Sequence, residues 1–282
     1  MKIEYKLYDP TWCPGCGNYM IRTALKQALE ELELPPYKVV ISSGIGQAAK
    51  IPHYIGVNGF NGLHGRAMPP AIAIKLSNKD LNVIVESGDG DNYGEGGNHF
   101  MHAVRRNIDL AHFVHNNQIY GLTKGQGSPT TAEGQITTLQ LDGVKSTPLD
   151  PLALSLTLGA GFVARGFSGD IPHLVELMKQ AITFKGYAHL DILQPCVVWN
   201  KVNTAKWYRD RVYKLSDDYD NTNYEEAYKK AREFGDKIPI GVLYKVEKPT
   251  YSDTFDFIKD GEPLVDRKLN PMDAEKLMSD FI

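Results

Sequence analysis

Hydrophobic residues recur at helical spacing in several segments of the chain. Apolar residues at positions 21, 25, 28, 29 and 32 repeat every three or four positions. This pattern predicts a helix that Asn18 caps and that Pro35 ends. A second helix is expected over 70–76, because Pro70 is suited to the first turn of a helix. Similar patterns predict further helices over 99–106, 171–183 and 224–234.

Short, uninterrupted apolar runs alternate with these helices. They predict strands at 39–41, 83–85, 113–114, 162–164, 190–193 and 240–246. Apolar strands separated by helices are typical of an α/β fold with a doubly wound parallel sheet that helices cover on both faces. Ligands of such folds bind at the carboxyl ends of the strands. The segments 42–50, 87–91, 116–123 and 195–196, which follow predicted strands, are therefore the candidate functional segments.

The composition excludes several classes of protein. Of 282 residues, 42% are hydrophobic and 23% are charged, as in ordinary globular proteins. Lys plus Arg number 31 against 34 Asp plus Glu, so no basic surplus exists for nucleic-acid binding. The longest apolar stretch, around 152–163, is shorter than the roughly 20 residues that a membrane span needs. The first residues also lack the apolar core of a signal peptide. We expect a cytoplasmic protein that binds neither nucleic acid nor a membrane.

The chain changes in character near residue 201, where it becomes more charged and richer in tyrosine. We expect residues 1–200 to form one domain that carries an N-terminal Cys-x-x-Cys segment. Residues 201–282 are expected to form an extension packed on that domain or on a partner subunit. Glycine is also unevenly distributed, since 11 of the 26 glycines lie between positions 44 and 97. Glycine permits tight turns and a close approach to a ligand, so this region is expected to contain a binding site.

The strongest chemical signal is Gly88-Asp89-Gly90, directly after a predicted strand, with Asn117 after the next strand. Gly-Asp-Gly alone is most often only a turn. This spacing, however, suits a diphosphate that is bound through Mg²⁺, because glycine permits backbone N–H groups to approach the phosphate oxygens. The Asp89 carboxylate, the Asn117 amide oxygen and the Ile119 carbonyl are the expected magnesium ligands.

The three cysteines, Cys13, Cys16 and Cys196, are too few for a disulfide framework. Two thiols two residues apart suit zinc, an iron–sulfur cluster or a redox dithiol. The residues alone leave these alternatives open, as well as small buried cysteines without a ligand. Lys50, His64 and Arg66 add groups that could hold an anionic substrate.

Several of these motifs together resemble one protein family. Gly-Asp-Gly followed by a distant Asn resembles the thiamin diphosphate (TPP) fingerprint. The wider pattern resembles the β subunit of 2-oxoacid:ferredoxin oxidoreductases over about residues 11–200. It comprises Trp12-Cys13-Pro14-Gly15-Cys16-Gly17, His64-Gly65-Arg66, Gly88-Asp89-Gly90-Asp91 and the run from Asn116 to Thr130.

The resemblance implies a TPP-binding, diphosphate-type domain that contains Mg²⁺ and an iron–sulfur cluster. It implies CoA-dependent oxidative decarboxylation of a 2-oxoacid, 2-oxoglutarate or pyruvate, with electrons passed to ferredoxin, or the reverse carboxylation. The expected partner is an α subunit that carries the pyrimidine-binding domain, in an (αβ)₂ assembly, and the chain is expected to be inactive alone. A non-redox TPP-dependent decarboxylase or synthase half, and a metal-binding electron-transfer subunit, are the competing hypotheses.

The resemblance also implies roles for individual residues. The catalytic candidates are Lys50, His64, Arg66 and Leu122. The expected cluster, [4Fe–4S] or [3Fe–4S], is held by Cys13, Cys16 and Cys196, whereas the third cysteine position of the family is Gln47 here. The residues expected to bind the coenzyme are Gly44, Ile45, Gly46, His64, Gly88, Asp89, Gly90, Asp91, Asn117, Ile119, Gly121, Leu122 and Thr123.

Overall fold

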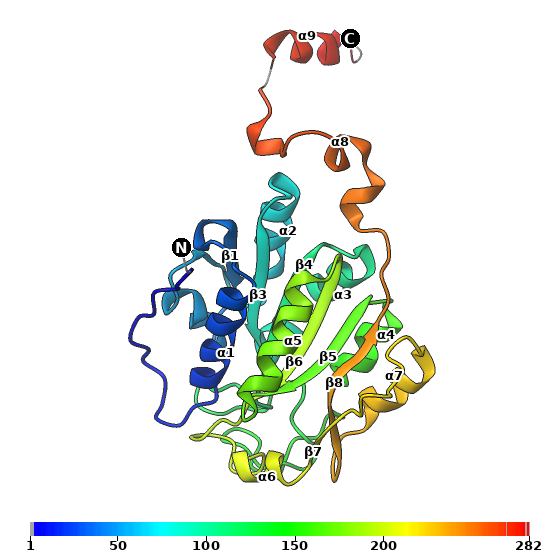
Figure 1. Ribbon diagram of the computed structural model, residues 1–282. Helices are drawn as coiled ribbons and strands as arrows, with labels where there is room; N and C mark the ends of the chain where they lie inside the picture. Colours follow the sequence, from blue (N-terminus) through cyan, green and yellow to red (C-terminus); the bar gives the residue numbers. More distant parts are fainter. Residues whose placement is uncertain (1–2, 269, 280, 282) are drawn as a thin grey trace.

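The computed structural model describes residues 3–268, 270–279 and 281, and this part of the chain is built on one eight-stranded sheet (Figure 1). The order of the strands is β2-β1-β3-β4-β6-β5-β8-β7. The strands span Val39–Ser43 (β1), Asn58–Asn61 (β2), Asn82–Gly88 (β3), Leu110–Asn116 (β4), Phe162–Phe167 (β5), Tyr187–Leu193 (β6), Val212–Lys214 (β7) and Ile238–Lys245 (β8).

Helices cover both faces of the sheet, which confirms the doubly wound α/β fold. On one face, α1 (Asn18–Glu31) and α5 (Ile171–Thr183) pack against each other and bury apolar side chains of β1, β4, β5 and β6. The other face packs against α2 (Met68–Ser77), α3 (Gly97–Arg106), α4 (Pro151–Thr157) and α7 (Tyr224–Arg232). The central strands are buried from both sides, as their uninterrupted apolar sequences predict.

The sheet is mostly parallel, with one exception. Strand β8 runs antiparallel to β5, and β7 then pairs parallel with β8. The predicted parallel sheet is therefore confirmed for its main part, and the direction of β8, which the sequence pattern does not specify, makes this edge mixed. An edge strand of opposite direction is common in such folds. The chain after residue 201 thus adds two strands to the sheet that the earlier residues form.

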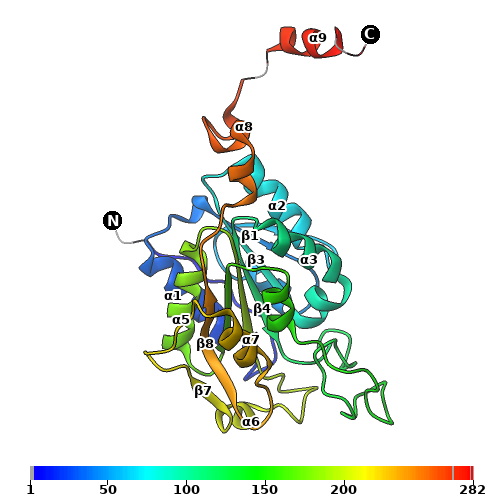
Figure 2. The same cartoon turned by 90° about the vertical axis from the view of Figure 1, so that its right-hand side faces the viewer.

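Short helices connect or follow these elements. After β8 the chain continues past α2, and the last helix extends away from the sheet in both views (Figures 1 and 2). None of the described helices is long and apolar enough to cross a membrane. The short helices are η1 (Pro36–Lys38), η2 (Ala48–His53), η3 (Gly90–Glu95), α6 (Ala205–Arg209), η4 (Tyr251–Thr254), α8 (Asp256–Lys259), η5 (Leu264–Asp266) and α9 (Pro271–Ser279).

Asn18 does not cap the first helix. The cap position is Gly17, and Asn18 is the first helical residue. Its buried side chain lies 2.7 Å from the Nδ1 atom of His115 on β4, and the Nε2 atom of His115 in turn lies 2.7 Å from Glu86 on β3. A tertiary hydrogen bond has therefore replaced the local cap that the sequence predicts for this residue.

The strand order brings the candidate functional segments together. Strands β1, β3, β4 and β6 are neighbours, and all four run in the same direction. Their carboxyl ends lead into residues 44–47, 89–91, 117–123 and 194–196, respectively. These segments therefore meet at one edge of the sheet, as the sequence predicts.

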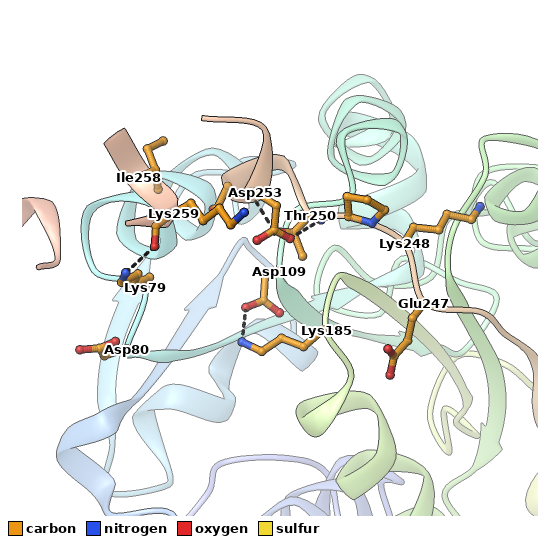
Figure 3. Close-up of a pocket in the computed structure, with 12 residues that line it drawn as sticks. Lys79, Asp80, Asp109, Lys185, Glu247, Lys248, Thr250, Asp253, Ile258 and Lys259 are labelled. Atoms are coloured by element: carbon orange, nitrogen blue, oxygen red, sulfur yellow. Dashed lines mark hydrogen bonds and ion pairs between the residues drawn. The ribbon is translucent and has the colours of Figure 1, made fainter. Parts of the chain in front are cut away.

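A hollow also lies at the opposite edge, where the strands begin (Figure 3). It has a volume of about 560 Å³, and Lys79, Asp109 and Lys185 line it together with the chain after β8. Within this hollow Lys185 and Asp109 form an ion pair at 3.3 Å, and Lys79 donates to the backbone carbonyl of Lys259 at 2.8 Å. None of the candidate site residues lines this hollow.

Candidate active site

A small cavity lies at the carboxyl edge of the sheet, where the Gly-Asp-Gly turn meets the loop after β4. All of the predicted coenzyme-binding residues except Gly44 line this cavity. Gln47, Ala48 and Tyr120 complete the wall. The structure thus brings together residues that are far apart in the sequence, and it does so at the place where a parallel sheet binds ligands.

Asp89 lies at the base of this cavity and is almost completely buried, with 1% of its surface exposed. Its Oδ2 atom accepts hydrogen bonds from the hydroxyl groups of Ser128, at 2.5 Å, and of Thr130, at 2.8 Å. Burial raises the pKa of Asp89 to about 6, although these hydrogen bonds lower it. The backbone N–H groups of Gly90 and Asn117 also hydrogen-bond to this carboxylate. A carboxylate has about four lone-pair sites, so Asp89 can still bind a cation.

Asp91 holds two glycine-rich turns against each other. Its Oδ1 atom accepts hydrogen bonds from the backbone N–H groups of Gly65, at 2.7 Å, and Ile45, at 3.1 Å. A Cβ atom on Gly44 would collide with the carboxylate of Asp91, and one on Gly65 would collide with the backbone of Glu95. The glycines at 44 and 65 are therefore required for this close packing, and Gly44 supports the cavity without lining it.

The loop after β4 presents the predicted metal ligands Asn117 and Ile119. Gln118 between them has a left-handed backbone, with φ at 57°. The Oδ1 atom of Asn117 accepts a hydrogen bond from the N–H of Ile119 at 3.1 Å, and its Nδ2 donates to Gln194 at 3.3 Å. An amide oxygen has a second lone pair, so the same Oδ1 atom remains able to bind a cation.

Tyr120 closes one side of the cavity. Its ring lies over Gly90, where a Cβ atom would collide with the ring. The hydroxyl group of Tyr120 donates to Glu95 at 3.0 Å, and the Nδ1 atom of His64 lies 3.1 Å from the same carboxylate. His64 thereby joins the glycine-rich turn, the helical segment η3 and the loop after β4.

The donor set fits a divalent cation. Burial raises the pKa values of both Asp89 and Asp91, and the Oδ2 atom of Asp91 is buried without a hydrogen-bond partner. No Lys or Arg is among the described residues that line the cavity. Because buried carboxylates need a positive partner, and because carboxylate, amide and carbonyl oxygens are preferred by Mg²⁺, the residues present suit this ion.

A second cavity, of about 200 Å³, adjoins the first. All three cysteines line it, and so does Gln47. Four residues are shared by the walls of the two cavities: Gln47, Asn117, Gly121 and Leu122.

Among the three cysteines, Cys16 and Cys196 are half-buried and Cys13 is exposed. Burial, together with smaller contributions from the neighbouring Cys196 and Cys13, raises the pKa of Cys16 to about 11. In the part of the chain that the structure describes, no three Cys, His, Asp or Glu side chains converge closely enough to hold a single metal ion. The ligands of an iron–sulfur cluster each bind a different iron, so they surround the cluster and do not converge on one point. The cysteine cavity is compatible with such a cluster.

Two of the predicted catalytic residues lie outside both cavities. Lys50 is half-buried on η2 and lines neither cavity. Arg66 is exposed, and its guanidinium group lies 3.2 Å from the Nε2 atom of His99. His64 and Leu122, by contrast, line the coenzyme cavity. The roles of Lys50 and Arg66 stay predictions.

Sequence reasoning did not assign Ser128, Thr130 or Tyr120 to the site. Ser128 and Thr130 lie 39 and 41 residues after the carboxylate that they bind. Thr130 also contacts Asn116, whose amide group donates to Asp191 on β6 at 3.2 Å. These residues lie in the run from Asn116 to Thr130 that carries the resemblance, but the sequence of this loop does not identify the partners of the hydroxyl groups.

Comparison with known families agrees with this geometry. Residues 42–192 match the family described as "Thiamine pyrophosphate enzyme, C-terminal TPP binding domain". Residues 196–260 match the family described as the C-terminal part of the pyruvate ferredoxin oxidoreductase beta subunit. The fold and the site therefore define a thiamin diphosphate-binding domain.

Individual relatives define the family more closely. The 2-oxoacid:ferredoxin oxidoreductase subunit beta of Saccharolobus solfataricus is 46% identical over 260 residues, which cover 88% of this chain and 84% of that one. The 2-oxoglutarate synthase subunit KorB of Methanocaldococcus jannaschii is 34% identical and covers 85% of this chain and 89% of its own. The chain therefore belongs to the β subunits of the 2-oxoacid:ferredoxin oxidoreductases, and it is a subunit of a multi-subunit enzyme.

A solved structure shows the same architecture. The 2-oxoglutarate:ferredoxin oxidoreductase from Magnetococcus marinus, with 2-oxoglutarate, coenzyme A and succinyl-CoA bound, superposes with a TM-score of 0.88 at 37% identity. The alignment covers 90% of this chain and 88% of that one. The fold of this β subunit is thus shared across nearly its whole length.

Proposed function

We propose that this β subunit binds TPP, Mg²⁺ and an iron–sulfur cluster, and that it acts in the CoA-dependent oxidative decarboxylation of 2-oxoglutarate or pyruvate, or in the reverse carboxylation. Its electron acceptor is ferredoxin. The observation that carries the proposal is the common wall of the coenzyme cavity and the cysteine cavity. A coenzyme that yields electrons and a cluster that accepts them would lie on either side of that wall.

Asp89, Asn117 and Ile119 hold the magnesium ion in this proposal. Ser128 and Thr130 hold the Oδ2 atom of Asp89, so the Oδ1 atom would be the oxygen that binds the ion. Gly88 leaves room for the diphosphate beside the backbone, whereas the absence of a side chain at Gly90 admits the ring of Tyr120. When bound, TPP supplies the electron sink for decarboxylation, while the chain supplies binding and orientation.

The other candidate residues have positioning or substrate-binding roles in this proposal. Gly44, Ile45, Gly46, Asp91, Gly121 and Thr123 shape the turns that surround the coenzyme. Leu122 lines both cavities and is 43% exposed, so it is placed to contact the substrate. His64, with Lys50 and Arg66, would hold an anionic substrate or CoA, since cations bind carboxylates and phosphates.

Cys13, Cys16 and Cys196 hold the cluster in this proposal. They come from the turn before α1 and from the residues after β6, which the fold brings to the same cavity. A thiol with a raised pKa is a poor ligand until a metal replaces its proton, so cluster assembly would release protons from this site.

In this proposal the active site is formed jointly with an α subunit, in an (αβ)₂ assembly. Several large apolar side chains at the carboxyl edge of the sheet are exposed, which is typical of a surface that a partner covers. The loop between β4 and α4 carries three of them and extends from the body in Figure 2. The most exposed are Leu63 (75%), Ile136 (71%), Leu139 (68%) and Leu141 (74%). We place the assembly in the cytoplasm.

The test is to co-purify the chain with its partner subunit and to measure its iron content, its visible spectrum and the 2-oxoacid-dependent reduction of a low-potential dye. We expect iron, bound TPP and CoA-dependent dye reduction by the complex, and no turnover by the chain alone. The Asp89→Ala complex is the control and is expected to lose TPP but keep iron. Turnover by the isolated chain, or a complex that binds TPP but contains no iron, would contradict the proposal.

A further inference from the structure

The cysteine cavity offers three thiols and one amide. Cys13, Cys16, Cys196 and Gln47 all line this cavity. A [4Fe–4S] cluster has four irons, and in ordinary sites each iron binds one cysteine thiolate. The chain has three cysteines in all. At most three irons can therefore receive a thiolate from this subunit.

Gln47 is held with its side chain at the boundary between the two cavities. Its backbone carbonyl accepts a hydrogen bond from the indole N–H of Trp12 at 2.8 Å, which fixes the residue beside the turn that carries Cys13. Its Oε1 atom is buried and has no hydrogen-bond partner. An unpaired buried oxygen costs free energy unless a ligand satisfies it.

We propose that Gln47 occupies the fourth corner of a cluster held by Cys13, Cys16 and Cys196, and that the iron at this corner is exchangeable. This inference rests on the proposed cluster. An amide oxygen is a harder ligand than a thiolate and binds iron beside sulfide more weakly. Because Gln47 also lines the coenzyme cavity, the exchangeable iron lies on the side that faces TPP.

Loss of the iron at one corner of the cluster can be measured after oxidation. Ferricyanide accepts one electron from [4Fe–4S]²⁺, the iron without a thiolate leaves as Fe²⁺, and [3Fe–4S]⁺ remains. The oxidised three-iron cluster is visible by electron paramagnetic resonance (EPR), and the released iron is measured by chelation. Reduction with added Fe²⁺ reverses the change.

The experiment compares the wild-type complex with two variants after anaerobic reconstitution with iron and sulfide. Gln47→Cys places a fourth thiolate at the proposed corner. Val198→Cys places an additional thiol on another part of the same cavity wall and is the matched control. We expect the wild type and Val198→Cys to lose one of four irons and to develop the three-iron EPR signal. Gln47→Cys is expected to keep all four irons and to develop no such signal.

The remaining outcomes separate this inference from the function on which it rests. A wild-type cluster as resistant to oxidation as that of Gln47→Cys would overturn the exchangeable corner. If Val198→Cys protected the cluster from iron loss as well as Gln47→Cys does, the exchangeable corner would also be overturned. The same holds if only the Gln47→Cys complex bound iron. Absence of iron from all three complexes would instead refute the proposed cluster.

TPP and Mg²⁺ added before ferricyanide should slow iron loss at least twofold in the wild type, and an unchanged rate would contradict the placement beside the coenzyme.

Discussion

The hydroxyl group of Ser128 donates a 2.5 Å hydrogen bond to the Oδ2 atom of Asp89, a carboxylate 39 residues earlier in the chain. Thr130 donates to the same oxygen. Two hydroxyl groups of the loop after β4 therefore hold one oxygen of the Asp89 carboxylate. This contact links the Gly-Asp-Gly turn to the end of the run from Asn116 to Thr130, a loop whose hydrophobic periodicity does not reveal the contact.

Loss of these hydroxyl groups should weaken magnesium-dependent coenzyme binding. Hydrogen bonds to charged groups contribute about 1.5–3 kcal/mol, so Ser128→Ala and Thr130→Val are each expected to weaken TPP binding about tenfold or more. Calorimetric titration of the assembled complex with TPP and Mg²⁺ measures the change. Thr130→Ser keeps a hydroxyl group and should restore most of the affinity. Equal losses in Thr130→Ser and Thr130→Val would show that the hydroxyl group is not responsible.

Asp89 should destabilise the metal-free fold at neutral pH. Burial raises its pKa from 3.8 to about 6, so between these values the folded chain binds the proton and the unfolded chain does not. The contribution of Asp89 to stability is therefore present below pH 4 and is lost as the pH rises through 6. The shift corresponds to about 3 kcal/mol at most.

Asp89→Asn removes this effect and provides its test. Without metal, the variant should have a higher free energy of unfolding than the wild type at pH 7, and the difference should shrink toward pH 4. Denaturant unfolding at several pH values measures it. With TPP and Mg²⁺ present the order should reverse, because only the wild type binds them. A difference that does not change with pH would contradict the assigned protonation.

The turn at Gly65 should tolerate no side chain. Its φ is 71°, and a Cβ atom would meet the backbone of Glu95. Gly65→Ala is expected to lower the free energy of unfolding by about 1–3 kcal/mol or more, the usual cost of such strain. Gly97→Ala is the matched control, because nothing lies within 4 Å of a Cβ atom there. Comparable losses in both variants would contradict the packing described.

Arg66 tests the proposed anion-binding role. In the assembled complex, Arg66→Ala should raise the KM for the 2-oxoacid or for CoA about tenfold and change kcat less, since it removes a charged contact with the bound molecule. The exposed cation Arg106 on α3 provides the control. Unchanged KM values for both the 2-oxoacid and CoA would show that Arg66 does not bind either molecule.

The sequence predicts much of the site because the topology of the fold is regular. Buried apolar strands give the sheet, and the shared direction of β1, β3 and β4 brings Ile45, Asp89 and Asn117 to one cavity. The contacts that periodicity does not encode are missed. They include the hydroxyl groups of Ser128 and Thr130, which act across a long irregular loop.

Local rules fail where tertiary contacts are stronger. Asn18 has the side chain of a helix cap, but a buried hydrogen-bonded chain to His115 and Glu86 holds it inside the helix. The apolar sequence of β8 is compatible with either direction of pairing, so its antiparallel contact with β5 could not be predicted from that sequence.

The central claim is that Asp89 and Asn117 bind the magnesium ion that anchors TPP. The most direct measurement is a structure of the assembled complex with TPP and Mg²⁺ at a resolution that shows the metal ligands. We expect the ion to contact the Asp89 carboxylate, the Asn117 amide oxygen and the Ile119 carbonyl, with the diphosphate beside Gly88 and Gly90. A coenzyme bound elsewhere, or an ion without Asp89 among its ligands, would contradict the account.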